Sequence, residues 1–425
     1  MGLLSEVNGE WILSFLDEQH KWDSIAEEPS LAIETAEIIH ALEFRGNTLG
    51  IDAGKRISKA LEKHPELKRA LWSDMFTGRM KSEIPPVLRS LCDSMMSVAV
   101  NLVELDLSDN AFGPIGAEGI EHFLQSPSAY SLQVLKLNNN GLGAGGKVIA
   151  RALKNCCINA KRDGRKFCLR SFIAGRNRLE MPGAIALADA FKEIGTLEEI
   201  NMHQNGINAS GIEALADSFK NNLSLRIINL SDNTFTSVGA KAIAKCLKMV
   251  AISYANNWYL TKLEVLHFGD CLCRNSGTVA LMESIHPTVH SKLKEINLSG
   301  NELGPPIIEK ILEKMAKDFS LDSLVLHTNN LGERFLGVKS RYTRHTFVDL
   351  GEESDDQGSL DDVEDGEVTD NDDRDEYTEE SKECVENGHS QAELRNVIMV
   401  WHFTVFILLH LLPFIIGLYL CLTFP

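Results

Sequence analysis

The sequence predicts an α/β fold: a curved solenoid with parallel strands on its concave face and helices on its convex face. Three observations predict it. The pattern L-x-x-L-x-L-x-x-N recurs along most of the chain. The closing positions of successive copies are at least 28 residues apart, which leaves room for one strand and one helix. Four intervening segments carry apolar residues at helical spacing, namely 117–124, 147–153, 211–219 and 240–247.

Ten copies of the pattern follow one another, and each predicts one strand. The clearest copies close at Asn110, Asn140, Asn233 and Asn301, and the weaker ones close at Asn47, Met75, Asn177, Asn205, Cys271 and Asn329. This is the signature of a leucine-rich repeat. Because each unit packs only on its neighbours, a chain of 425 residues need not divide into several globular domains.

The repeat separates structural positions from available ones. The leucines point into the core between sheet and helices, and the closing Asn satisfies backbone groups in the turn. The remaining strand positions face the concave surface, so function is expected there and in the loops at the rim. Three long intervals, 75–110, 140–177 and 233–271, hold insertions, and such insertions commonly map to one binding face.

The chain divides into four predicted parts: an N-terminal cap region at 1–30, the repeat domain at 31–347, an acidic disordered linker at 348–395 and a tail anchor at 396–425. Between Asp349 and Glu386 there are 19 acidic residues and two basic ones, so most of the net charge of −18 belongs to the linker. This charge argues against nucleic acid as a partner and favours basic partners.

The C-terminus is predicted to anchor the chain in a membrane. Residues 397–424 are mainly apolar and long enough to cross the hydrocarbon core as a tilted helix. Since the N-terminus lacks a signal-peptide pattern, the solenoid is expected on the cytoplasmic face of the endoplasmic reticulum or the outer nuclear envelope. The alternative is an apolar tail that comes from a different transcript and inserts into no membrane.

Two places on the predicted rim carry candidate functional residues. The inserted loop at 76–85 is bounded by Gly and Pro, and it is expected to expose Arg79 and Lys81 because neither can join the core. In the run of three asparagines that ends at Asn140, only Asn140 occupies a closing position. Asn139 is therefore expected to point outward as a hydrogen-bonding group. The alternative in both places is ordinary solvated surface.

No cofactor or metal site is predicted. The segment GLGAGGK at 141–147 has the spacing of glycine-rich nucleotide motifs, but Val148 stands where a magnesium-binding Ser or Thr is needed. The repeat already accounts for the glycines. The 13 histidines and nine cysteines show no metal-ligand spacing. A self-contained enzyme is therefore not expected.

Six strings resemble the Ran GTPase-activating protein family, and they occur in the family's order. They are RGNTLG at 45–50, SDMFTGRMKSEIP at 73–85, LSDNAFGP at 107–114, NNGLG at 139–143, GRNRLE at 175–180 and DNTFT at 232–236. The resemblance covers about residues 30–335, and the inserted loop with Arg79 is far more specific than any leucine pattern.

The resemblance implies an activator that binds Ran in its GTP form, in nucleocytoplasmic transport, with a Ran-binding protein as a further partner. GTP and magnesium are bound by the GTPase, and the activator orients the GTPase's own catalytic glutamine. The resemblance implies that Asn139 reaches the active site of the GTPase, and that Arg79 and Lys81 dock it, with an arginine-finger role for Arg79 left open. Asn47 and Thr48 are weaker contact candidates.

The competing interpretation is a leucine-rich-repeat adaptor or inhibitor module, tethered to a membrane, without GTPase-activating activity. An inhibitor has no need of the Arg79 loop and Asn139 together, which favours the activator. A third interpretation, an enzyme with its own nucleotide site at 141–147, predicts that the isolated chain binds GTP.

Overall fold

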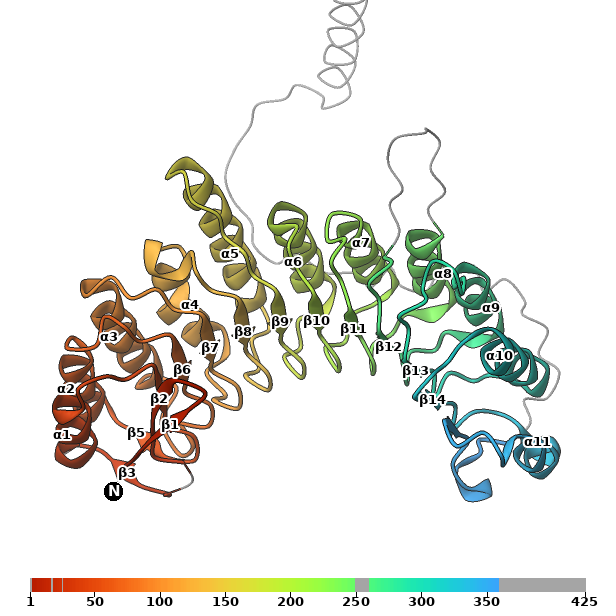
Figure 1. Ribbon diagram of the computed structural model, residues 1–425, viewed down its shortest axis with the longest axis horizontal. Coiled ribbons are helices and arrows are strands. Elements are labelled where there is room, and N and C mark those ends of the chain that lie inside the picture. The colour runs from red at the N-terminus through yellow and green to blue at the C-terminus, as the bar shows by residue number, and fades with distance from the viewer. Residues whose placement is uncertain (1, 17, 25, 249–259, 359–425) are drawn as a thin grey trace, which may run out of the picture. The chain divides into compact units, whose positions relative to one another are not determined.

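The computed structural model describes residues 2–16, 18–24, 26–248 and 260–358. Within them, strands and helices alternate, and Figure 1 shows the strands along the inner side of an arc and the helices along its outer side. The sheet has 13 strands, in the order β1-β2-β4-β6-β7-β8-β9-β10-β11-β12-β13-β14-β15. The predicted α/β solenoid of parallel strands and helices is confirmed.

Each of the ten predicted repeats contributes one short parallel strand. The ten strands are β4 (Ala41–Glu43), β6 (Arg69–Leu71), β7 (Glu104–Asp106), β8 (Val134–Lys136), β9 (Ser171–Ile173), β10 (Glu199–Asn201), β11 (Ile227–Asn229), β12 (Val265–His267), β13 (Glu295–Asn297) and β14 (Ser323–Val325). The middle residue of each is buried, and the two outer residues are half-buried in most of them. Alternate side chains therefore face the core and the concave surface.

The helices between the strands cover the convex side (Figure 1). They are α1 (Glu27–Thr35), α2 (Ile51–Leu61), α3 (Ile84–Ser97), α4 (Gly113–Leu124), α5 (Gly145–Arg162), α6 (Glu180–Ile194), α7 (Ala209–Phe219), α8 (Thr236–Leu247), α9 (Arg274–Ser284), α10 (Pro305–Asp318) and α11 (Phe335–Tyr342). In α7 the side chain of Asn208 accepts the Gly211 N–H at 3.1 Å, and Ile212, Leu215 and Phe219 form the buried face.

The closing asparagines form a ladder inside the solenoid, interrupted at Met75 and Cys271. Asn140 is typical: its Nδ2 donates to the carbonyls of Leu107 at 2.8 Å and Leu137 at 3.0 Å, and its Oδ1 accepts the Asn110 N–H at 2.9 Å. One side chain thus joins its own turn to the preceding repeat. At Cys271, which replaces the asparagine, the thiol contacts carbonyl oxygens of the same kind.

Both ends of the solenoid are closed by added strands. At the N-terminus, β1 (Leu3–Val7) pairs antiparallel with β2 (Glu10–Ser14), which lies parallel to β4. A separate two-stranded sheet joins β3 (Lys21–Trp22) to β5 (Thr48–Leu49). At the other end, β15 (Val348–Asp349) pairs with β14. Such caps cover the open edges of the first and last repeats.

The fold extends past the boundary at 347 that the sequence analysis set. After β15, the 3₁₀ turn η3 (Glu353–Asp355) follows, and the Asp356 carboxylate accepts the Leu331 and Gly332 N–H groups at 2.7 Å each, at the start of the 3₁₀ turn η2 (Gly332–Arg334). Residues 348–358 therefore belong to the C-terminal cap, because carboxylates suit free N–H groups at a helix start.

The rest of the predicted acidic linker and the whole tail anchor lie outside the described residues. Within the part that the structure describes, no helix is long and apolar enough to cross a membrane.

The first two predicted insertions do not share one face. The interval 75–110 lengthens the connection between β6 and α3, whereas the interval 140–177 lengthens α5 to 18 residues. The interval 233–271 includes residues 249–259, which lie outside the described part. Of the first two insertions, the one at 75–110 therefore adds a loop at the edge where the strands end, and the one at 140–177 does not.

Candidate functional site

A row of residues with left-handed backbone runs along this edge, and we call it the rim row. In all ten repeats the residue just before the closing position has φ between 47° and 78°. Its members are Gly46, Asp74, Asp109, Asn139, Arg176, Gln204, Asp232, Asp270, Gly300 and Thr328. Left-handed backbone is uncommon for residues other than Gly, Asn and Asp, so the repeat itself imposes it.

Asn139 holds the rim-row position after β8, and its side chain is exposed as predicted. Its backbone N–H donates to the Gly175 carbonyl at 2.9 Å, and its Nδ2 donates to Asp109 Oδ1 at 3.0 Å. The side chains of its two neighbours make hydrogen bonds within the fold. Asn138 Oδ1 accepts the Gly175 N–H at 2.7 Å, and Asn140 belongs to the ladder. Of the three asparagines, Asn139 is the exposed one.

A polar hollow lies beside Asn139. It is lined by Arg45, Ser73, Asp74, Asp106, Ser108, Asp109, Lys136 and Asn138. Lys136 joins the hollow to the concave face, since its Nζ donates to Glu104 Oε1 at 2.6 Å, and Arg69 Nε donates to the other oxygen of Glu104 at 3.0 Å. Burial alone would raise the pKa of Glu104, but the hydrogen bonds and charges of Lys136 and Arg69 outweigh it and hold this pKa below its ordinary value.

Arg79 does not stand free, contrary to the sequence prediction. Its side chain is only 10% exposed. The guanidinium donates to Thr48 Oγ1 at 2.9 Å and to the carbonyls of Trp22 at 3.2 Å and Thr48 at 3.3 Å, and it pairs with the Asp23 carboxylate. The long side chain reaches back over the sheet of β3 and β5 and finds partners there. Arg79 therefore fastens the inserted loop to the N-terminal cap.

Lys81 is exposed on the same loop, as predicted, next to Met80, which is 67% exposed. No ion pair involves Lys81 among the described residues. The loop thus offers one cation and one flexible apolar side chain to solvent.

Asn47 and Thr48 are both buried. Asn47 closes the first repeat: its Nδ2 donates to the carbonyl of Phe44 at 3.1 Å, and its Oδ1 accepts the His20 N–H at 2.9 Å. Thr48 accepts the hydrogen bond from Arg79. The structure thus brings Arg79 and Thr48 together, whereas Asn139 lies two repeats beyond the Arg79 loop. Contact of Asn47 or Thr48 with a partner stays a prediction, and these internal hydrogen bonds argue against it.

Backbone conformation and packing explain the glycines of the segment at 141–147. Gly141 and Gly143 have φ of 61° and 47°. A Cβ at Gly145 would lie 2.9 Å from the Pro114 Cα, and one at Gly146 would lie 2.5 Å from a methyl group of Leu179. The first N–H groups of the helix donate to carbonyls of the preceding turn, Gly145 to Leu142 at 2.7 Å and Gly146 to Gly143 at 3.0 Å. These groups are therefore not free to hold a phosphate.

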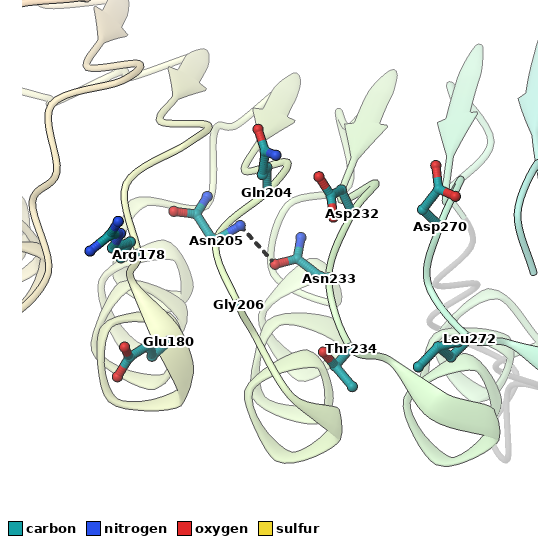
Figure 2. Close-up of a pocket in the computed structure, with 10 residues that line it drawn as sticks. All are labelled: Arg178, Glu180, Gln204, Asn205, Gly206, Asp232, Asn233, Thr234, Asp270 and Leu272. Carbon is teal, nitrogen blue, oxygen red and sulfur yellow. Dashed lines mark hydrogen bonds between the residues drawn. The ribbon is translucent and has the colours of Figure 1, made fainter.

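A second polar hollow lies further along the rim (Figure 2). It is lined by Arg178, Glu180, Gln204, Asn205, Gly206, Asp232, Asn233, Thr234, Asp270 and Leu272. Figure 2 shows Gln204, Asp232 and Asp270 projecting in the same direction from successive repeats. Burial and the charge of Asp232 raise the pKa of Asp270. The rim row was not predicted from the sequence as a set, although the position before each closing residue identifies it.

The strand pattern, the asparagine ladder and the closing strands define this chain as a leucine-rich-repeat protein. A family model described as Leucine Rich repeat matches residues 99–120, 196–216, 221–244 and 289–312.

Among known proteins, Ran GTPase-activating protein 2 of Caenorhabditis elegans is 50% identical over 361 residues, which are 83% of this chain and 36% of that protein. Ran GTPase-activating protein 1 of Xenopus laevis is 54% identical over 43% of this chain and 32% of the relative. Ran GTPase-activating protein of Drosophila melanogaster is 43% identical over 48% of this chain and 35% of the relative. The resemblance seen in the sequence motifs is confirmed. The chain spans about a third of the length of these relatives.

Proposed function

We propose that this chain stimulates GTP hydrolysis by the small GTPase Ran, which it binds in its GTP form. The observation that carries the proposal is the 50% identity over 83% of the chain to a protein named Ran GTPase-activating protein. The rim supports it, because Asn139 is an exposed amide on a rigid ladder of repeats. Rigid placement suits phosphoryl transfer, in which positioning and electrostatics supply most of the catalysis.

In this proposal the GTPase holds the nucleotide and magnesium, and the chain supplies no active site of its own. Asn139 enters the site of the GTPase and helps to orient its catalytic glutamine, which positions the attacking water. The glycine-rich segment at 141–147 takes no part, since Gly145 and Gly146 are required by helix packing and Gly141 and Gly143 by their positive φ. The isolated chain is accordingly expected to bind no GTP.

Arg79 and Lys81 have different parts in the proposal. Lys81 meets the partner directly, because it is exposed on the inserted loop. Arg79 acts indirectly, by holding the loop in place, because three neutral oxygen acceptors and the Asp23 carboxylate already bind its guanidinium. A finger role would require it to leave these partners, including the ion pair with Asp23.

The test is single-turnover GTP hydrolysis by purified Ran, with and without the full chain, in mild detergent. Strong acceleration that Asn139→Ala removes, while Ran still binds, supports the activator. An adaptor or inhibitor module predicts binding without acceleration, and that outcome would reject the proposal. Adding a Ran-binding protein to the same assay tests it as a further partner, which should change the affinity for Ran without being needed for turnover.

We also propose that residues 397–424 hold the chain on the cytoplasmic face of a membrane, with the endoplasmic reticulum and outer nuclear envelope as candidates. The apolar length of the segment supports this. Alkaline carbonate extraction of membranes from cells that express the full chain tests it. Release into the soluble fraction would reject anchoring.

A further inference from the structure

The hydrogen bond between Asn139 and Asp109 determines which end of the amide faces outward. We infer that Asp109 is a positioning residue for Asn139, and that Asn139 presents its carbonyl oxygen, a hydrogen-bond acceptor, to the partner. This inference rests on the proposed function, because it concerns the same site. To the proposed function it adds which atom of the Asn139 amide meets the partner and which residue orients that amide.

The backbone brings the two side chains together. Both residues are in the rim row, with φ of 60° at Asp109 and 52° at Asn139. The Asp109 N–H donates to the Asn138 carbonyl at 2.8 Å, and the Asn139 N–H donates to the Gly175 carbonyl at 2.9 Å. Each rim residue is thus tied to the next repeat. The distance between the two side chains follows from the spacing of adjacent repeats.

The chemistry of the pair then decides the orientation of the amide. Asn139 Nδ2 lies 3.0 Å from Asp109 Oδ1. A carboxylate accepts hydrogen bonds and donates none, so the NH₂ group, and not the carbonyl oxygen, must face it. The carbonyl oxygen of Asn139 therefore points away from Asp109, and in the described part of the chain it receives no hydrogen bond. The neighbouring Asn138 has no such freedom, because its oxygen accepts the Gly175 N–H.

The charge of Asp109 also strengthens the acceptor. A hydrogen bond to a charged group is stronger than a neutral one, and it polarises the amide toward its oxygen. The group that meets Asn139 must then be a donor. The NH₂ of a partner carboxamide fits, and it leaves the oxygen of that carboxamide free to accept a hydrogen bond from the attacking water.

The decisive experiment exchanges the two side chains. Asn139→Asp keeps an acceptor oxygen but places two carboxylates at hydrogen-bond distance, so the side chain turns away. Adding Asp109→Asn restores the hydrogen bond with reversed direction, conserves the charge of the pair and again leaves an acceptor oxygen outward. If Asn139 acts as a donor, the double variant has no donor at this position and stays inactive.

We measure single-turnover hydrolysis by Ran at saturating concentrations of the full chain, together with the Kd for Ran-GTP. Asn139→Asp alone should lower the rate about tenfold or more, as expected when a hydrogen bond involving a charged group is lost. Asp109→Asn alone should lower the rate about threefold. Either end of the new amide can face Asn139, so the carbonyl oxygen of Asn139 points outward only part of the time. The double variant should recover to the rate of Asp109→Asn alone, well above that of Asn139→Asp. Kd should change far less than the rate.

The matched control is Asp232→Asn, which makes the same exchange at an exposed rim-row position whose neighbour is Gln204. It should leave the rate unchanged, and all variants should keep the wild-type unfolding midpoint. A double variant as slow as Asn139→Asp overturns the inference, and so does an Asp109→Asn variant as fast as wild type. Failure of the wild-type chain to stimulate Ran would instead reject the proposed function.

Discussion

Alanine substitution should reduce mainly the stability of the fold at Asn140 and mainly the stimulation of Ran at Asn139. Asn140 is 1% exposed, and its side chain makes three hydrogen bonds, to the carbonyls of Leu107 and Leu137 and from the N–H of Asn110. Each such bond contributes about 1 kcal/mol, and unpaired buried groups add to the loss. Asn140→Ala should therefore lower the free energy of unfolding by about 3–5 kcal/mol.

Asn139→Ala should cost far less stability. Its side chain is exposed and makes one hydrogen bond, to Asp109, so about 0.5 kcal/mol is lost there. Alanine in left-handed backbone adds about 1 kcal/mol, because φ is 52° at this position. The total is at most about half of the loss at Asn140, whereas stimulation of Ran should fall much further with Asn139→Ala than with Asn140→Ala.

Urea unfolding followed by circular dichroism, paired with the hydrolysis assay, separates the two effects. Asn140→Ala should shift the midpoint to lower urea and retain stimulation wherever it remains folded. Asn139→Ala should shift the midpoint by at most about half as much as Asn140→Ala does and should lose stimulation. Equal midpoints for Asn140→Ala and wild type would refute the ladder argument, since the asparagine would then contribute nothing to the fold.

Three further predictions follow from contacts described above. Arg79→Ala should lower the thermal unfolding midpoint. Arg79→Lys should not restore it, because an ammonium group cannot replace the forked guanidinium. Unchanged stability with lost stimulation would instead support an arginine-finger role for Arg79. The lowered pKa of Glu104 means that its ion pairs stabilise the fold above the ordinary glutamate pKa and that this contribution is lost as pH falls through the lowered value. Glu104→Gln should thus be less stable than wild type at neutral pH and approach it in acid, and parallel curves would contradict this. Asp356→Ala removes the acceptor for two N–H groups, so the last repeat should exchange amide hydrogens faster while the central repeats stay protected.

The repeat could be predicted from the sequence because its signal is periodic and local. The spacing identifies even the two closing positions that hold no asparagine, Met75 and Cys271, and each of them follows a strand. The same rule assigns Asn47 to the ladder, since Asn47 occupies a closing position. Its role as a contact came from the family resemblance alone.

The state of Arg79 could not be predicted in the same way. Its partner Asp23 lies 56 residues earlier in the chain, and no periodicity connects them. A loop bounded by Gly and Pro indicates an exposed backbone, but a long side chain can fold back from it. The acidic composition after residue 347 was similarly misleading, because Asp356 uses its charge to cap η2.

The rim row has a consequence for how such proteins acquire new partners. Its backbone is held by neighbouring repeats whether the residue is Asp109, Asn139, Arg176 or Gln204. A substitution there changes an acid, an amide or a cation without altering the path of the chain. Adjacent members lie about 5 Å apart, the spacing of neighbouring strands, so a side chain is influenced mainly by the two beside it. Evolution can therefore adjust recognition by this protein one repeat at a time, with effects confined to adjacent pairs.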